Sequence, residues 1–547
     1  MTRGQATPRA DQTKVTPRNR DRNACGDRLR PNHRRERDID PGPQIDAGVI
    51  LIGAFGHRQA LIEQLDLEAH GRIVPDCQPL TAPYAIARLP DPNDGSYTDA
   101  LFEAFGTTYA ETGAPVRVDF RALMPSASAT ERATHLIHPY PAKLLRHIPA
   151  LFLSANQLSR PGDSVLDPFC GSGTVLVESL LAGRRAIGAD TNPLACLIAK
   201  VKTTPLRDRD LPRTLERVIA RARDISNAAI PNRSALAPWF HPRMLRELAR
   251  IRAAIARVRD EDVRDFFSVC FSSTVRTASL ADPRISVPVR QRPSRYSKHD
   301  WLHARAVRRL ADLERTSAYE LFSRIAEANM DRLAGLPLEV ARGDAHTELA
   351  DARNITCNTV DSSVLAGQVD LVLTSPPYLG AQKYVRACSL SLLWLDLVPD
   401  GNLQTLARVS IGREHFRKGD YERPTLSGVP DADAVISAVR PINPLRAHLA
   451  ATYLTEMRAA LGRIATALKP SGAIVLVAGG NSLCGRDFDT PGYLTDLAAE
   501  RGLTLEFALV DKIRSRGLMT RRNRSASPIS EEVILVLRKG HAQRVRA

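Results

Sequence analysis

The chain has 547 residues, a formal net charge of +16 and an isoelectric point near 9.8. Its length exceeds what one hydrophobic core usually supports, so we expect two to four structural units. Mean hydropathy is −0.22, and no apolar run approaches the roughly 20 residues that cross a bilayer, which argues against a membrane protein.

The charge balance favours a polyanionic partner such as a nucleic acid. Residues 1–45 hold 11 Lys/Arg and 6 Asp/Glu, so they explain only about a third of the excess, and the rest falls on the folded body. The alternative is that a generally arginine-rich composition produces the excess. The eight cysteines include no CxxC pair and no regular spacing, which predicts neither a metal site nor a disulfide framework and is typical of a cytoplasmic protein.

The N-terminal part of the sequence indicates little about function. Residues 1–45 lack hydrophobic periodicity and predict a disordered basic tail. Residues 46–130 contain one short apolar run, 48–53, and a helix-like stretch from Tyr97 to Tyr109. We treat 46–130 as an accessory region, because its pattern suggests no role.

Strands and helices alternate from residue 131 onward. Asp163–Asp167 predicts a strand, and a Gly-rich turn then leads into a helix over 175–182. Arg185–Asp190 predicts a second strand, which a helix over 193–200 follows. Two successive βα units of this kind predict a parallel sheet with crossover helices.

A helical insertion, residues 207–336, interrupts this alternation. Its helices are predicted over 211–225, 242–258, 263–279 and 317–336. A basic loop over 283–309 separates the last two and places Tyr296 and Trp301 among several arginines and Lys298. This mixture suits phosphate contacts combined with base stacking, and a solvated loop anchored by two aromatic residues is the alternative.

The alternation resumes at Pro337. Further strands are predicted within Pro337–Asp344 and over 369–373, 472–478, 504–510 and 532–538, with the last two as an antiparallel pair at the sheet edge. The predicted fold class is therefore α/β, with a doubly wound, seven-stranded, mostly parallel sheet. It would comprise residues 131–206 and 337–547, with the helical insertion between them.

Glycines and acidic residues stand at the ends of the first three predicted strands. Gly171 and Gly173 lie in the turn Asp167–Thr174, where a residue without Cβ lets the backbone approach a ligand. Asp190 ends the second strand about 20 residues later, where a carboxylate accepts hydrogen bonds from ribose hydroxyls. Asp344, at the end of the third strand, suits an adenine amino group. Together they predict an adenosine ligand, although each alone is also typical of a turn or helix cap.

The fourth strand ends in Thr-Ser-Pro-Pro-Tyr, where the prolines must stop the sheet ladder. This motif and Asp167–Thr174 together resemble the S-adenosylmethionine-dependent DNA amino-methyltransferases, which methylate N4 of cytosine or N6 of adenine. A third segment, Ile-His-Pro-Tyr-Pro-Ala-Lys-Leu at 137–144, is similar to the family segment that completes the cofactor pocket. The resemblance implies a Rossmann-like class I methyltransferase fold. The order of the two motifs and the insertion at 207–336 depart from the commoner family pattern.

The resemblance also implies the cofactor S-adenosylmethionine, a duplex DNA substrate with a flipped target base, and no metal. Ser375 and the Pro376 carbonyl would accept the hydrogens of the target amine, Pro377 would stiffen the corner, and Tyr378 would stack on the base. Serine in the first position favours N4 of cytosine over N6 of adenine. The implied cofactor-binding residues are Tyr140, Lys143, Asp167, Phe169, Gly171, Ser172, Gly173, Thr174, Asp190, Asn192 and Asp344.

Two other functions stay open. A tRNA guanine-N2 methyltransferase would share the 138–143 and 167–171 segments, but usually carries Asp where Ser375 stands. A catalytically inactive nucleic-acid-binding protein is the second, and the intact Ser375 and Tyr378 argue against it. For the DNA enzyme, a cognate restriction or defence system would be a partner. Target recognition would reside in 207–336, in 381–440 or in a basic hairpin tip, 512–524.

Overall fold

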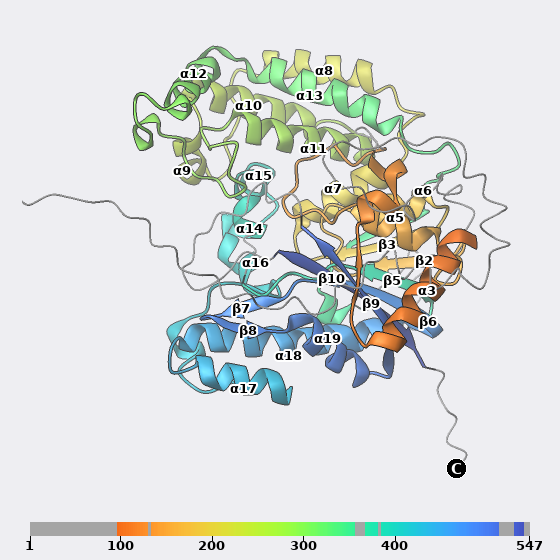
Figure 1. Ribbon diagram of the computed structural model, residues 1–547. Coiled ribbons are helices and arrows are strands. Elements are labelled where there is room, and N and C mark those ends of the chain that lie inside the picture. The colour runs from red at the N-terminus through yellow and green to blue at the C-terminus, as the bar shows by residue number, and fades with distance from the viewer. Residues whose placement is uncertain (1–95, 129–132, 356–366, 381–383, 514–529, 541–547) are drawn as a thin grey trace, which may run out of the picture. The chain divides into compact units, whose positions relative to one another are not determined.

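The computed structural model describes residues 96–128, 133–355, 367–380, 384–513 and 530–540 (Figure 1). These ranges all belong to one compact unit. The predicted disordered tail and the apolar run at 48–53 lie outside the described residues. Among the helices of the described ranges, none is long and apolar enough to cross a membrane.

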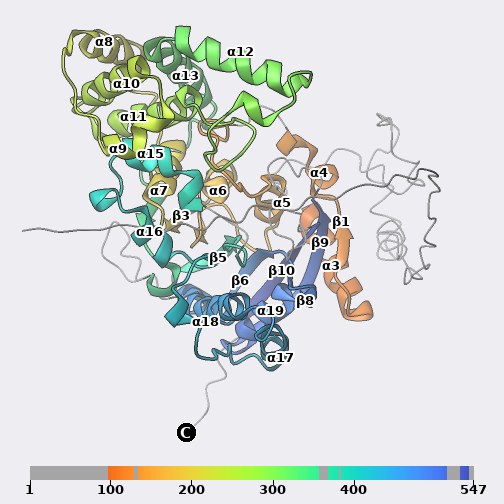
Figure 2. The ribbon, with the colours of Figure 1, turned by 90° about the vertical axis from the view of Figure 1, so that its left-hand side faces the viewer.

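An eight-stranded sheet lies at the centre of the described chain, in the order β1-β9-β10-β6-β5-β2-β3-β4. The predicted α/β class with a mostly parallel sheet is confirmed, but the sheet has eight strands instead of seven. The additional strand, β1, pairs in parallel with β9 at the sheet edge (Figure 2). The strands are β1 (Val116–Val118), β2 (Ser164–Asp167), β3 (Arg185–Asp190), β4 (Ala345–Leu349), β5 (Val369–Thr374), β6 (Leu468–Ala478), β9 (Leu503–Lys512) and β10 (Glu531–Lys539), and a separate ribbon pairs β7 (Asn481–Leu483) with β8 (Arg486–Phe488).

Strand β10 lies inside the sheet and not at its edge. It runs antiparallel to both neighbours, so that Leu535 stands opposite Leu476 of β6 and Ala508 of β9. The prediction of an antiparallel pair is confirmed, and its placement at the edge is wrong. Because β10 runs against the parallel strands, its first residues, Glu531 and Glu532, lie at the edge where those strands end.

The third predicted strand begins later than expected. The sequence predicts it within Pro337–Asp344, whereas β4 starts at Ala345. Leu338 is 80% exposed, Gly343 has φ +98°, and the Asp344 carboxylate accepts the Ala341 N–H at 2.6 Å, so this stretch forms a turn. The prediction failed because β4 is a half-buried edge strand and lacks the apolar run that marks a buried one.

Helices cover both faces of the sheet, as a doubly wound fold requires. One layer contains α3 (Ser96–Thr112), α5 (His147–Ser154) and α6 (Thr174–Leu181), and the other contains α17 (Pro430–Val439), α18 (Pro444–Ala467) and α19 (Thr490–Ala499). Leu371 and Leu373 of β5 pack in the first layer, and Val372 between them packs in the second. Successive residues of a strand point to opposite faces, which explains why the central strands are apolar throughout.

The helical insertion forms at the predicted positions and shares a hydrophobic core with helices that adjoin the sheet, among them α7 (Pro193–Thr203). Its helices are α8 (Leu211–Asp224), α9 (Arg233–Leu236), α10 (Pro242–Ile255), α11 (Glu261–Ala278), α12 (Trp301–Arg315) and α13 (Ala318–Leu333). Phe240 and Phe271 each pack edge-on against Trp394 of α15 (Ser389–Trp394), with 5.8 Å between ring centroids. The last part of the predicted basic loop is helical, because α12 already begins at Trp301.

Candidate active site

The two predicted motifs meet at one edge of the sheet. β2 lies between β3 and β5 and runs parallel to both, so the carboxyl ends of the three strands are adjacent. Thr374, the last residue of β5, donates its hydroxyl to Asp167 Oδ1 at 2.6 Å. Burial raises the pKa of Asp167 to about 7, although this bond acts against the rise. The bond joins the Gly-rich turn directly to the residue before Ser375.

Two glycines with positive φ shape the Gly-rich turn. Gly171 has φ +50° and Gly173 has φ +76°, a region that costs a residue with a Cβ about 1–2 kcal/mol. A Cβ on Gly173 would lie 3.0 Å from the Cβ of Ala199 in α7 (Pro193–Thr203), so Gly173 permits helix packing. A Cβ on Gly171 would meet nothing nearer than 3.8 Å, so only its backbone conformation requires glycine. The close approach that the structure shows at Gly173 is to helix α7, and an approach of this turn to a ligand stays a prediction.

Asp190, at the end of β3, holds this turn in place. Its carboxylate accepts the Gly171 N–H at 3.0 Å on one oxygen and the Asn192 N–H at 2.8 Å on the other. Burial raises the pKa of Asp190 to about 6, and the two amide bonds act against the rise. Each oxygen keeps a further lone pair, so the same carboxylate can also accept hydrogen bonds from a ligand.

The segment before β2 forms a wall beside the Gly-rich turn. Tyr140 is buried, and its hydroxyl accepts Asn192 Nδ2 at 3.1 Å. The Asn192 side-chain oxygen accepts the Leu194 N–H at 3.1 Å and so caps α7. The structure thus brings Tyr140 and Asn192, two of the predicted cofactor residues, together with Gly171 and Asp190.

Lys143 stabilises its own segment. Its Nζ donates to the carbonyl oxygens of His135 and His138, at 3.0 and 2.5 Å. Burial, together with the nearby Arg332 and Arg146, lowers the pKa of Lys143 to about 8. Contact between Lys143 and a cofactor stays a prediction.

Three more predicted residues belong to the turn itself. Ser172 is buried, and its carbonyl accepts Nζ of the buried Lys202 at 2.8 Å. Phe169 is partly buried against the core layer of α18, and Thr174 begins α6. These contacts fix the turn between the sheet and its helices, so the conformation of its backbone is set in advance.

Asp344 is the one predicted cofactor residue that lies elsewhere. It precedes β4, and its carbonyl accepts the Ala186 N–H near the start of β3, which is the opposite edge of the sheet. The acid that follows β4 is Asp351, whose carboxylate accepts Arg353 Nε at 2.9 and 3.0 Å. Burial would raise the pKa of Asp351, but the Arg353 bonds lower it overall. Asp351 was missed because β4 was placed too early in the sequence.

Three distant segments hold the Ser-Pro-Pro-Tyr corner. Tyr378 donates its hydroxyl to Glu532 Oε1 at 2.7 Å, at the start of β10. Asn481 Nδ2 donates to the carbonyl of the next residue after Tyr378 at 2.8 Å, and the Gly380 N–H donates to the Gly412 carbonyl at 3.2 Å. A Cβ on Gly412 would lie 2.8 Å from the Tyr378 carbonyl oxygen, so glycine is required there.

Tyr378 connects the corner to β10. Ser375 is half-buried, and its side chain lies close enough to the Tyr378 hydroxyl to act on the pKa of Tyr378, which itself donates to Glu532. Burial, with Glu532 close by, raises the pKa of Tyr378 well above its usual value, so the phenol stays protonated. Glu532 was not predicted as a site residue. An acidic residue at the start of an antiparallel strand could have indicated it, because such a strand begins at the edge where the neighbouring parallel strands end.

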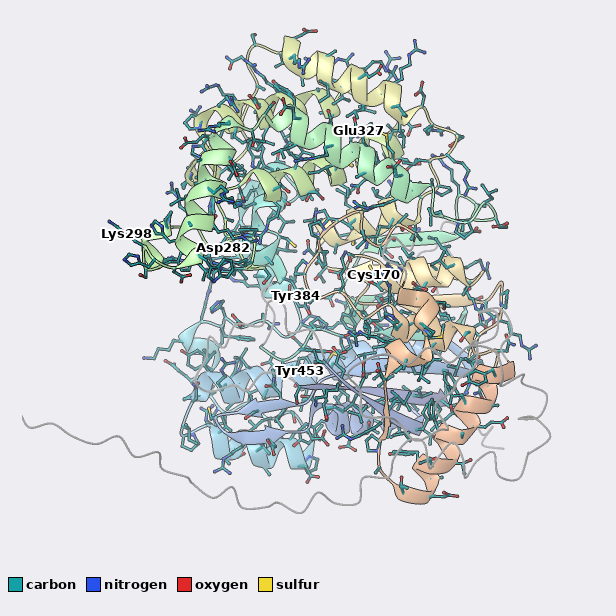
Figure 3. The ribbon with its side chains drawn as sticks, turned by 45° about the horizontal axis from the view of Figure 1, so that its top comes forward. Cys170, Asp282, Lys298, Glu327, Tyr384 and Tyr453 are labelled. Carbon is teal, nitrogen blue, oxygen red and sulfur yellow. The ribbon has the colours of Figure 1, made fainter. Side chains whose placement is uncertain are left out.

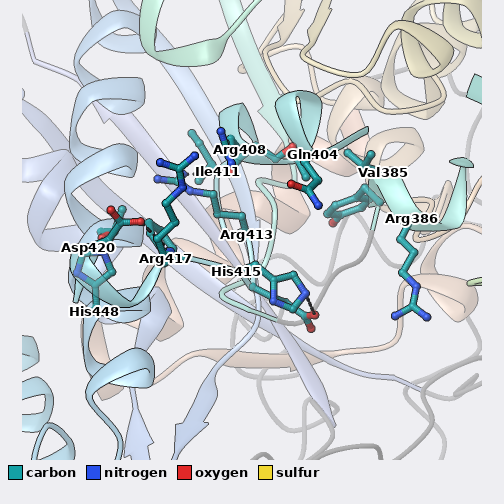
Figure 4. Close-up of a pocket in the computed structure, with 17 residues that line it drawn as sticks. Val385, Arg386, Gln404, Arg408, Ile411, Arg413, His415, Arg417, Asp420 and His448 are labelled. Carbon is teal, nitrogen blue, oxygen red and sulfur yellow. Dashed lines mark hydrogen bonds and ion pairs between the residues drawn. The ribbon is translucent and has the colours of Figure 1, made fainter. Parts of the chain in front are cut away.

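A pocket of about 810 Å³ lies next to this corner (Figure 4). Its walls come from α14 (Tyr384–Ala387), α16 (Leu403–Val409), the loop 410–420 and α18, and they include Gly412. Arg413 is held inside the fold, because it donates to Glu456 at 2.6 Å and lies 4.4 Å from the Phe416 ring centroid. Three exposed arginines of the pocket make no side-chain hydrogen bond or ion pair within the described chain: Arg386, Arg408 and Arg417.

This pocket lies in the second predicted target region, 381–440. Lys383 of that region lies outside the described residues, and so does the predicted hairpin tip from residue 514 onward. His415 and Lys418 are exposed beside the pocket arginines. The pocket therefore places positive charge directly after the Ser-Pro-Pro-Tyr corner.

Comparison with known proteins indicates the class. Residues 119–201, which run from the end of β1 through the Gly-rich turn into α7, match the family model described as DNA methylase. A domain of this class uses S-adenosylmethionine as the methyl donor, which is the cofactor predicted from the sequence. Together with the fold, this match indicates a Rossmann-like methyltransferase.

Two curated proteins are similar to parts of the chain. Type II methyltransferase M.MvaI of Kocuria varians is 27% identical over 295 residues, which are 50% of this chain and 59% of that protein. Type II methyltransferase M.MjaII of Methanocaldococcus jannaschii is 33% identical over 112 residues, 20% of this chain and 21% of that protein. The chain thus spans less than two thirds of the length of either relative.

Among solved structures, the rRNA methyltransferase aviRa from Streptomyces viridochromogenes aligns with 75% of this chain and 92% of its own. The identity is 13% and the TM-score is 0.23. A TM-score this low supports neither a shared fold nor a shared function.

Proposed function

We propose that the chain is a site-specific DNA methyltransferase that methylates the exocyclic amine of a flipped base, with N4 of cytosine favoured over N6 of adenine. The hydrogen bond from Thr374 to Asp167, at 2.6 Å, carries the proposal. It joins the turn expected to hold the cofactor to the corner expected to hold the target amine. The DNA methylase match and the two type II relatives favour DNA over RNA.

The groups at this edge of the sheet fit S-adenosylmethionine. Asp190 would accept the ribose hydroxyls, and the backbone of the Gly-rich turn would lie against the methionine part. Asp351, at the end of β4, takes the adenine position first assigned to Asp344. When bound, the cofactor supplies a methyl group activated by its sulfonium.

The target amine requires hydrogen-bond acceptors, because its lone pair is delocalised into the aromatic ring. Ser375 Oγ and the Pro376 carbonyl would accept its two N–H groups and favour a pyramidal nitrogen with an available lone pair. Both prolines and the three contacts around the corner fix these acceptors before the base arrives, and preorganised acceptors lower the barrier. Tyr378 would offer its ring to the flipped base.

Glu532 would act as a positioning residue for these acceptors. It accepts the hydrogen bond of the Tyr378 hydroxyl, so the phenol oxygen keeps lone pairs that can accept from Ser375. With its own proton directed toward Tyr378, the Ser375 oxygen presents lone pairs to a third group. The chain of three residues thus sets Ser375 as an acceptor and not as a donor.

We assign the catalytic unit to 131–206 and 337–547. The accessory region 46–130 contributes α3 and β1 to its sheet edge, and the basic loop 283–309 of the helical insertion and the pocket region 381–440 would contact DNA around the target. The type II names of the relatives favour a cytoplasmic enzyme with a cognate restriction partner. The test for that partner is to ask whether extracts from cells that lack the gene for this chain cleave host DNA.

The proposal is tested by methyl transfer in vitro. Purified protein and tritiated S-adenosylmethionine are offered duplex DNA and total tRNA, and the label is traced to a nucleoside. Label in N4-methylcytosine supports the proposal, label in N6-methyladenine of DNA overturns only the choice of base, and label in N2-methylguanosine of tRNA overturns the proposal.

A pair of serine variants tests the catalytic corner. Ser375→Ala should abolish transfer while cofactor binding, measured by calorimetry, is retained. Ser268→Ala is the matched control, because that hydroxyl only donates to the Arg264 carbonyl within α11, at 2.8 Å. Full activity of Ser375→Ala would show that its oxygen is not an acceptor for the amine.

A further inference from the structure

The helical insertion carries a basic arm, residues 290–309, that is built on an ordered base. Ala281 and Arg290 form an antiparallel bridge, with Asp282 N–H to Val289 O and Gln291 N–H to Leu280 O each at 2.8 Å. The arm then runs through a short turn into the first turns of α12.

Three arginines hold the base of the arm and are not available to a partner. Arg284 forms an ion pair with Asp282 at 2.7 Å and also donates to the Tyr296 hydroxyl. Arg309 donates to the Ser279 carbonyl at 2.9 Å, and Arg276 donates to the Ile285 carbonyl. Tyr296 is therefore part of this scaffold. Of the two roles considered for this aromatic residue, base stacking and anchoring of the loop, its contacts favour anchoring.

The other cations of the arm face solvent. The arm has seven Lys/Arg and a single acid, Asp300, whose carboxylate already caps α12 by accepting the Leu302 N–H at 2.8 Å. Six exposed cations make no side-chain hydrogen bond or ion pair within the described chain: Arg290, Arg292, Arg295, Lys298, Arg305 and Arg308. An ordered scaffold that presents so many unpaired charges of one sign suits a regular polyanion.

Trp301 adds an exposed aromatic ring among these cations. It is the first residue of α12, is 65% exposed, and has the Arg305 guanidinium 5.9 Å from its ring centroid. The other two tryptophans lie deeper, with Trp394 fully buried and Trp239 half-buried. Such an exposed ring contributes little to folding and is typical of a contact surface when it lies within a charged patch.

The base of the arm is packed against the elements that form the candidate active site. α11, from which the arm rises, contacts both α7 and α15, and Phe271 of α11 packs on Trp394. In Figure 3, Asp282 lies between Lys298 at the tip of the arm and Tyr384 at the pocket. The arm is therefore connected through α11 to the elements beside the candidate active site.

We propose that the arm binds the phosphodiester backbone of the DNA duplex beside the flipped base. The proposal rests on the proposed function, and it assigns to the arm a sequence-independent contact, because guanidinium and ammonium groups read phosphates and not bases. Duplex DNA, with one charge per about 1.7 Å of axis, matches a row of unpaired cations better than a folded protein does. Trp301 would become covered by the sugar–phosphate edge.

A triple variant, Arg292→Gln/Arg295→Gln/Lys298→Gln, tests this contact. The Kd of the intact protein for a duplex of about 30 base pairs is measured by fluorescence anisotropy over a range of salt concentrations. The slope of log K against log salt should fall by about 2.7, at about 0.9 per lost cation, and the affinity near 150 mM salt by about 100-fold. The matched control is Arg213→Gln/Arg217→Gln/Arg221→Gln, three exposed arginines on α8, which should keep the wild-type slope.

Two results would overturn the inference: an unchanged slope in the arm variant, or an equal fall in the α8 control, since the latter indicates diffuse attraction. A loss of tRNA affinity without any loss of DNA affinity would overturn it as well. Failure of the wild-type protein to methylate DNA would instead overturn the proposed function. Trp301→Phe gives an independent reading, because the change in tryptophan fluorescence on DNA binding should disappear with it and persist in the α8 control.

Discussion

The contact between Tyr378 and Glu532 gives the sharpest test of how the corner works. Glu532→Ala removes the acceptor of the Tyr378 hydroxyl, which lies 2.7 Å away, and leaves the phenol free to donate toward Ser375. A hydrogen bond to a charged group contributes about 1.5–3 kcal/mol. If this energy is lost only in the transition state, kcat falls about 10- to 150-fold. Cofactor affinity should not change, because Glu532 lies on the target side of the corner.

The rate of methylation in single-turnover experiments at saturating DNA measures this change, and variants of neighbouring residues serve as controls. Glu531→Ala, on the same strand, removes an exposed ion pair with Arg117 at 2.7 Å, so it should cost less than about 1 kcal/mol of stability and leave kcat unchanged. Tyr378→Phe should match Glu532→Ala, and the double variant should be no worse than the weaker single one. Equal losses for Glu531→Ala and Glu532→Ala, or additive losses in the double variant, would refute the positioning role.

Three further predictions concern the cofactor side of the site. Gly173→Ala should lower the free energy of unfolding by about 2–5 kcal/mol in urea titrations, because the cost of positive φ and the cost of the close contact with Ala199 add. The control is Gly162→Ala, where φ is +89° and the space around the residue is open, and it should lower the free energy of unfolding by only about 1–2 kcal/mol. The pKa of Asp167 is raised to about 7 in the fold, so its contribution to stability is present below about pH 4 and is lost as the pH rises through 7, and Asp167→Asn should flatten that dependence. Protonation of Asp190, whose pKa is about 6, removes an acceptor for ribose hydroxyls, so cofactor Kd from calorimetry should rise below that pH.

The parts of the fold that the sequence predicted are those in which local pattern and burial agree. β5 is an apolar run that a double proline ends, and it is almost entirely buried. The helices of the insertion follow the helical period, and α8 buries Leu211, Leu215, Val218 and Ala222 at that spacing. In these elements a single pattern determines both the local structure and the face that packs, so neighbours need not be known.

The missed parts depend on tertiary neighbours. β4 is an edge strand whose Ala-His-Thr-Glu-Leu sequence is only half-buried, so no periodicity marks it. Because the predicted strand ended about one strand length too early, Asp344 was selected as the acid that follows it, where Asp351 stands in the structure. β1 has three residues and becomes a strand only because β9 offers a free edge. The link from Tyr378 to Glu532 joins residues 154 positions apart, and it exists only because β10 inserts antiparallel between β6 and β9.

The geometry of the corner also explains why the two motifs behave as one unit. Asp167 belongs to the Gly-rich turn through its bond from the Phe169 N–H, at 3.1 Å, and to the catalytic corner through its bond from Thr374. Both bonds end on the same buried oxygen, so a shift of β5 relative to β2 would leave at least one donor without a partner in the interior, at a cost of about 1–3 kcal/mol. The register between β2 and β5 is therefore fixed where cofactor and target must be brought into line. Since methyl transfer depends on that alignment, this buried carboxylate connects the stability of the sheet to the chemistry proposed for its edge.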